Sequence, residues 1–75
     1  MIVARINAYD AALGTLRRIY RVVAEDAALA LALVEGDRAT PTEWRLTVAM
    51  VRPAKEWDTP RIEAWTDVDD GKVAA

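Results

Sequence analysis

Hydrophobic and polar residues alternate in three segments of the chain, and this period of two predicts three β-strands. The segments are residues 2–6 (IVARI), 43–51 (EWRLTVAMV) and 61–68 (RIEAWTDV). Each is rich in β-branched or aromatic residues, which favour extended backbone. The segment at 43–51 has the clearest alternation, with Leu46, Val48 and Met50 on one face.

Between the first two of these segments, apolar residues recur at the spacing of an α-helix. At about 100° per residue they form one stripe about 80° wide, which predicts a continuous amphipathic helix. Asp10 is a suitable N-cap and Gly36 a suitable C-terminal stop, while Gly14 weakens the helix locally. The stripe consists of Leu13, Leu16, Tyr20, Val23, Ala27, Leu31 and Val34.

The run AALALALVEG, residues 27–36, leaves a second interpretation open because its leucines and alanines alternate. Alternation is typical of a strand, and Glu25 and Asp26 would then form a helix end and a turn. Alanine, however, is the best helix former and is depleted in strands, and leucine also favours helices. The composition therefore favours a helix over this run.

These elements predict an α+β fold in the order β-α-β-β. One long amphipathic helix packs on a three-stranded, mostly antiparallel sheet, and residues 1–68 form a single small domain. Residues 37–43 and 52–60 are expected to be connections, and residues 69–75 a frayed acidic and alanine-rich tail. The sheet residues expected to meet the helix are Ile2, Ile6, Leu46, Val48, Met50, Ile62 and Val68. The other face of the sheet is expected to be bare and to carry Val3, Arg5, Thr47, Ala49, Val51 and Trp65.

The inventory of reactive side chains argues against an enzyme. The 75 residues contain no Cys, His or Ser, so a thiolate or imidazole metal site and a nucleophilic triad are ruled out. Three isolated glycines form no phosphate-binding loop. We therefore expect no catalytic residue, no cofactor and no metal.

Only carboxylates remain as candidates for chemistry. Glu56, Asp58 and Glu63 are near enough in sequence for an acid/base pair, but charged residues of a polar connection are usually solvated. The DVDDG segment, with Asp67, Asp69 and Asp70, resembles the start of a calcium loop, yet the chain lacks the distal Glu that closes such a loop. We expect a solvated acidic tail.

Three arginines, Arg17, Arg18 and Arg21, would form a weak basic patch on the predicted helix. On the functional interpretation, these arginines contact phosphate groups or an acidic partner. The formal net charge of −2 argues against nucleic acid as a partner, and the patch then serves as a solvated flank with Glu25 paired to Arg21. No apolar run reaches the roughly 20 residues of a membrane span, and no secretory signal is present, so a cytoplasmic location is expected.

Surplus apolar residues predict a surface for a partner. On the helical interpretation Val22, Leu29 and Leu33 lie on the side of the helix away from the sheet. Trp57 in the second connection and Trp65 on the last strand are further candidates, since exposed tryptophan is enriched at binding hot spots. The alternative for the tryptophans is a small core in which Trp57 covers Trp65.

The N-terminal strand, the turn containing Asn7, a helix that begins near Leu13 and the later strand RLTVAMV resemble part of the ACT ligand-binding domains. The resemblance covers about half of the chain. It implies a dimeric domain that senses a small molecule between strands. Such domains usually carry Pro-Gly in the first turn, and NAYDAAL has neither residue.

The sequence therefore predicts a small non-enzymatic protein-interaction module that acts by surface binding. Its size fits a regulator or inhibitor, including a phage-encoded blocker of a host system. The partner is expected to be another protein or a second copy in a homodimer. The ACT-like small-molecule sensor is the alternative.

Overall fold

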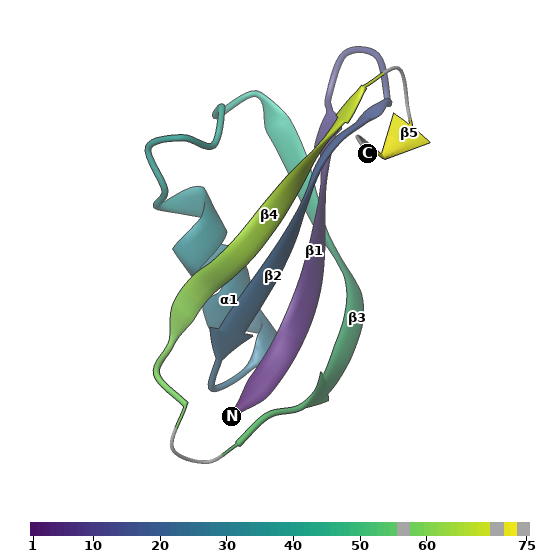
Figure 1. Ribbon diagram of the computed structural model, residues 1–75. Coiled ribbons are helices and arrows are strands. Elements are labelled where there is room, and N and C mark those ends of the chain that lie inside the picture. The colour runs from purple at the N-terminus through teal and green to yellow at the C-terminus, as the bar shows by residue number, and fades with distance from the viewer. Residues whose placement is uncertain (56–57, 70–71, 74–75) are drawn as a thin grey trace.

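A computed structural model describes residues 1–55, 58–69 and 72–73 and shows one helix and five strands in this part of the chain (Figure 1). The predicted α+β class is confirmed, and each predicted strand segment is a strand. The number of strands and the length of the helix differ from the prediction. The elements are β1 (Ile2–Asp10), β2 (Leu16–Ala24), α1 (Ala27–Glu35), β3 (Trp44–Pro53), β4 (Arg61–Asp69) and β5 (Lys72–Val73).

The strands form one sheet in the order β3-β1-β2-β4-β5, and all neighbours are antiparallel. The β1–β2 hairpin is the centre, and β3 and β4 are added on its two sides. The helix α1 lies against one face of this twisted sheet (Figure 1). The other face has no helix on it among the described residues, and we call it the open sheet face.

The long helix predicted over residues 13–34 is wrong, because residues 16–24 form the central strand β2. The run LRRIYRVVA is rich in β-branched and aromatic residues, which favour a strand. The strand also pairs with both β1 and β4, and the resulting hydrogen bonds and packing outweigh the local propensity for a helix. Leu13, a predicted core residue, is 73% exposed in the turn before β2.

The turn between β1 and β2 is fixed by Asp10 and Gly14. The carboxylate oxygen Oδ1 of Asp10 accepts hydrogen bonds from the backbone N–H groups of Ala12 and Leu13, each at 2.9 Å. Gly14 has φ of +71°, a left-handed conformation that glycine adopts at little cost. Asp10 therefore ends a strand here, although the same residue type is also a good helix N-cap.

The helix begins after Asp26, whose Oδ1 accepts a hydrogen bond from the N–H of Leu29 at 2.8 Å. It ends at Gly36, whose N–H donates to the carbonyl oxygen of Ala32 at 3.0 Å, so the predicted stop is confirmed. The strand alternative for residues 28–34 is wrong. Asp26, not Asp10, is the N-cap, and α1 spans only nine residues.

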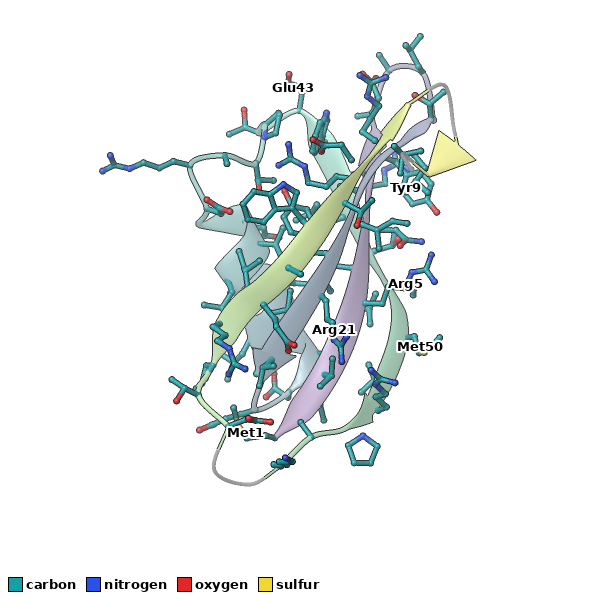
Figure 2. The ribbon with its side chains drawn as sticks, in the orientation of Figure 1. Met1, Arg5, Tyr9, Arg21, Glu43 and Met50 are labelled. Atoms are coloured by element: carbon teal, nitrogen blue, oxygen red, sulfur yellow. The ribbon has the colours of Figure 1, made fainter. Side chains whose placement is uncertain are left out.

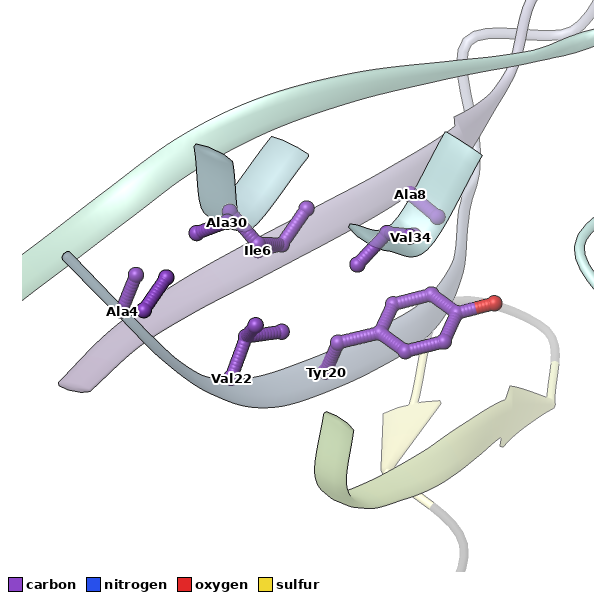
Figure 3. Packing of buried hydrophobic residues seen from close by; sticks show 8 residues of the cluster. Ala4, Ile6, Ala8, Tyr20, Val22, Ala30 and Val34 are labelled. Carbon is purple, nitrogen blue, oxygen red and sulfur yellow. The ribbon is translucent and has the colours of Figure 1, made fainter. Parts of the chain in front are cut away.

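The core lies between the sheet and α1 and consists mainly of small and β-branched side chains (Figure 3). Of the predicted sheet core residues, Ile6 is fully buried, and Ile2, Leu46, Val48 and Ile62 pack partly buried against the cluster. Val68 is 5% exposed. The fully buried cluster is Ala4, Ile6, Ala8, Tyr20, Val22, Ala24, Ala30 and Val34.

Register irregularities move two residues to faces that strict alternation does not predict. In β3 the pairing with β1 shifts between Arg5 and Ile6, so Met50 leaves the core face and is 54% exposed. In β4 the pairing with β2 shifts between Arg21 and Val22, so Trp65 pairs with Tyr20, a core-face residue. An extra residue in one strand reverses the side-chain phase beyond it.

The predicted tail at residues 69–75 lies only partly within the described residues. There, Asp69 still belongs to β4 and pairs with Lys72 of β5. The described part of the chain contains no helix that is both long and apolar enough to cross a membrane.

Candidate interaction surface

The open sheet face carries arginines and aliphatic residues in rows that run across the strands. In the first row, Arg52, Val3, Val23 and Arg61 follow one another over β3, β1, β2 and β4. In the second row, the order over the same strands is Met50, Arg5, Arg21 and Ala64. Arginine therefore occupies the two ends of the first row and the centre of the second.

Arg52 and Val3 of the first row and all four residues of the second row line a groove of about 450 Å³, whereas Val23 is 1% exposed. Arg5, Arg21 and Arg52 contribute its positive charge, and Ile19 and Met50 are among its apolar residues. Figure 2 shows Arg5, Arg21 and Met50 on the side of the sheet away from α1. Apolar surface rimmed by charged groups is typical of an interaction site.

The arginines of the groove are poorly neutralised. Arg5 lies directly opposite Arg21 in the β1–β2 register, and like charges in directly opposed positions destabilise a sheet. Arg21 has one carboxylate nearby, with its Nε 3.9 Å from Oε2 of Glu63, and Arg61 shares that carboxylate at 4.0 Å. Within the described residues, neither Arg5 nor Arg52 has a carboxylate within 4.0 Å.

Charge is thus distributed unevenly over a chain whose net charge is −2. The open sheet face is basic, whereas carboxylates flank both ends of α1 on the opposite side of the molecule. Glu25 and Asp26 precede the helix, Glu35 is its last residue and Asp37 follows it. A basic face on an acidic chain favours an anionic partner at that face and disfavours indiscriminate binding elsewhere.

The predicted basic patch of Arg17, Arg18 and Arg21 does not exist as a unit. The three residues lie on a strand rather than on a helix, so Arg18 and Arg21 point to opposite faces of the sheet. Arg17 is at the irregularity in the β1–β2 pairing and is exposed. Arg21 pairs with Glu63 rather than with the predicted Glu25.

Arg18 has a structural environment on the helix side of the sheet. Its Nε is 2.5 Å from Oδ1 of Asp67, and its Nη1 donates hydrogen bonds at 3.1 Å to the Tyr20 hydroxyl and to the Ala39 carbonyl oxygen. Its guanidinium carbon lies 5.1 Å from the ring centroid of Trp44 and 5.7 Å from that of Trp65. Burial opposes the charge of Arg18, but hydrogen bonds to Asp67 and Tyr20 raise its pKa above the ordinary value.

The predicted partner-binding residues are also separated. Val22 lies in β2 and is fully buried in the core, and Leu33 of α1 is partly buried against that core. Leu29 is 47% exposed and Trp65 51% exposed, so these two remain accessible. Trp57 lies outside the described residues, and with it the predicted cover of Trp65.

The carboxylates do not converge. Glu63 faces arginines of the open sheet face and Asp67 binds Arg18. Glu56 and Asp70 lie outside the described residues, and the structure describes the backbone of Asp69 but not its side chain. Among the side chains that are described, no group of three or more His, Cys, Asp or Glu residues could hold a metal ion.

Sequence reasoning missed Arg52, Ile19 and Met50 as parts of one surface, and placed Arg5 on a bare sheet face without assigning it a role. The signal that was present is the alternation of arginine with apolar residues along strands, as in Val3-Ala4-Arg5 and Ile19-Tyr20-Arg21. The ACT resemblance fails structurally, because a hairpin replaces the helix near Leu13. Comparisons with family models, curated proteins and solved structures give no match, so the surface is interpreted from its own geometry.

Proposed function

We propose that the chain is a non-enzymatic protein-binding module that holds an acidic protein surface on its open sheet face. The observation that carries the proposal is the direct opposition of Arg5 and Arg21, with Arg52 in the same groove. A fold gains nothing from this like-charge cluster by itself. A partner carboxylate lowers the repulsion, and arginine binds carboxylates through two parallel hydrogen bonds.

The apolar part of the groove favours a protein over a nucleic acid. Proteins that bind single strands combine a basic groove with aromatic side chains on which bases stack. Here Val3, Ile19 and Met50 line the groove between the arginines. Tyr20 and Trp65 also line it, but Tyr20 is fully buried in the core cluster and Trp65 is its partner in the β2–β4 register. The rings of Trp44 and Trp65 lie against Arg18 on the helix side of the sheet. Methionine and aliphatic residues suit the side chains of a protein partner.

A regulatory or inhibitory role follows from the same proposal. A small module that covers an acidic surface of its partner excludes other ligands from that surface. Positive charge at the rim accelerates association, and the apolar floor lowers the rate of dissociation. This mode of action needs no catalytic residue.

The test is a titration with fluorescein-labelled poly-L-glutamate at low salt, followed by fluorescence anisotropy. We expect binding that weakens with salt, and an affinity loss of about fivefold for Arg5→Gln and for Arg52→Gln, typical of one rim charge. Arg38→Gln is the matched control, because Arg38 is an exposed arginine after α1.

Absence of binding to polyglutamate, or an equal loss with Arg38→Gln, overturns the proposal. A labelled oligothymidylate of similar charge is titrated in parallel. Tighter binding of the oligothymidylate than of polyglutamate would make nucleic acid the partner and would also overturn it.

A further inference from the structure

We infer that the acidic partner binds as an extended segment, which pairs with the outer edge of β3 and continues the sheet. This inference rests on the proposed function and specifies how the partner is held. It requires an edge strand with available backbone groups, apolar side chains that a neighbouring strand would cover, and positive charge without carboxylates.

Strand β3 forms one edge of the sheet. It is the first strand in the order β3-β1-β2-β4-β5, and among the described residues only β1 pairs with it (Figure 1). Alternate backbone N–H and C=O groups of an edge strand point outward and can bind a further strand. Natural edge strands are often very short, whereas β3 has ten residues. Its protection is limited to a bulge at Ala49 and to Pro53 at its end.

Two consecutive apolar side chains of β3 are exposed on opposite faces of the sheet. Met50 is 54% exposed and lies opposite Arg5, on the open sheet face. Val51 is 46% exposed and lies opposite Ala4 of the buried core cluster, so it is on the helix side. A partner that lies only on the open sheet face covers Met50 but not Val51. A strand added at the edge flanks both, because successive residues of a strand point to opposite faces.

The charges of β3 favour an acidic strand over a second copy of the same edge. Residues 44–53 contain two arginines and no carboxylate. Arg45 lies opposite Tyr9 and Arg52 opposite Val3, so both are on the open sheet face. Within the described residues, neither arginine has a carboxylate within 4.0 Å. Two β3 edges would bring together only positive charges, whereas acidic residues of an added strand would face the arginines and lower their repulsion.

The outer edge of β4 is less suited to such a partner. Its last residues, Val68 and Asp69, already pair with β5. Glu63 and Asp67 add negative charge along this strand and form ion pairs with arginines of β2. An acidic segment at this edge would meet like charges, which destabilise a strand pair. Of the two edges, β3 therefore fits an acidic strand.

The test uses a fluorescein-labelled peptide of alternating Glu and Val, Glu-Val-Glu-Val-Glu-Val-Glu, titrated with the full chain at low salt and followed by fluorescence anisotropy. A second form is N-methylated at its three central residues, which removes N–H donors on both edges of the peptide without changing its charge. We expect the methylated form to bind at least about tenfold more weakly, because backbone hydrogen bonds to β3 are lost.

A protein variant tests the position of the peptide. Val51→Gln should weaken binding of the unmethylated peptide about fourfold, although Val51 lies on the face opposite the arginine groove. Leu29→Gln is the matched control, because Leu29 is equally exposed but lies on α1, and it should leave binding unchanged. Circular dichroism melts confirm that both variants are folded.

Equal binding of the two peptides, unchanged binding by Val51→Gln, or an equal loss with Leu29→Gln overturns the inference. Sedimentation velocity of the chain alone should show a monomer. A dimer that Val51→Gln dissociates would assign the edge to a second copy and would also overturn it. The polyglutamate titration tests the proposed function separately. Polyglutamate binding without a preference for the unmethylated peptide leaves the proposed function in place and rejects pairing at the edge of β3.

Discussion

Arg18 donates a hydrogen bond from Nη1 to the hydroxyl oxygen of Tyr20, 3.1 Å away and two residues further along the same strand. The hydroxyl oxygen of Tyr20 is also 2.6 Å from Oγ1 of Thr40 in the connection after α1. Arg18 binds the same connection through the Ala39 carbonyl oxygen. These contacts attach residues 37–43 to the sheet and position Trp44 at the start of β3.

Replacing Arg18 by Gln is therefore expected to destabilise the fold by about 1–3 kcal/mol, the range for losing hydrogen bonds to a charged, mostly buried group. Urea denaturation measures this change. Arg17→Gln, at the exposed neighbouring position, should change stability by less than about 0.5 kcal/mol. Equal effects of the two substitutions would contradict a structural role for Arg18.

The pH dependence of this contribution follows from the direction of the pKa shift. The pKa of Arg18 in the folded protein is raised above its ordinary value, so the stabilisation is fully present at any pH below that ordinary value. It is lost only as the pH rises through the raised pKa. The difference between wild type and Arg18→Gln should accordingly be the same at about pH 6 and about pH 9.

Gly14 is expected to resist replacement by alanine because of its backbone and not because of crowding. Its φ is +71°, and a Cβ placed there meets no atom within 4 Å. Gly14→Ala should cost about 1–2 kcal/mol from the left-handed conformation alone, whereas Gly14→Asn should cost less, since Asn adopts that conformation more readily. Thermal melts of the two variants provide the comparison, and equal melting temperatures would contradict it.

The hairpin at Gly14 also explains how far the fold was predictable. The strands at residues 2–6, 43–51 and 61–68 were predicted because each combines alternation with β-branched residues. The strand at residues 16–24 was not predicted. Leu16 and Tyr20 fit a helical stripe, but they fit equally well a strand in which every second residue lies on one face. Only the pairing of β2 with β1 and β4, which sequence periodicity does not report, decides between the two.

The interaction surface was less predictable than the fold for a related reason. Val3 and Arg5 were placed on the bare side of the sheet, but Met50 was assigned to the core and Trp65 to the bare side. Both errors result from register shifts, and a shift reverses every side chain beyond it. The position of an extra residue depends on the partner strand, so alternation along one strand does not locate it.

The two leucines of α1 that sequence analysis grouped together should now behave differently. Leu29 is 47% exposed, whereas Leu33 packs against the core cluster. Leu29→Glu is expected to change the free energy of unfolding by less than about 0.5 kcal/mol, and Leu33→Glu to lower it by about 2 kcal/mol or more. Urea denaturation of both single variants distinguishes them. A destabilised Leu29→Glu would place Leu29 in the core rather than on the exposed side of α1.

Neutralising Arg5 is expected to stabilise the isolated chain while it weakens binding. Arg5 lies directly opposite Arg21, and within the described residues no carboxylate lies within 4.0 Å of Arg5. Arg5→Gln should therefore raise the free energy of unfolding by about 0.5 kcal/mol at low salt, and the gain should shrink as salt screens the repulsion.

The measurement is urea denaturation of wild type and Arg5→Gln at low and high ionic strength, with Arg38→Gln as the matched change in charge. We expect Arg5→Gln to raise the free energy of unfolding by more than the control does, and to weaken polyglutamate binding. Both results together indicate that Arg5 serves binding at the expense of stability. A loss of stability would instead mean that Arg5 supports the fold, and the opposition of Arg5 and Arg21 would no longer argue for an anionic partner.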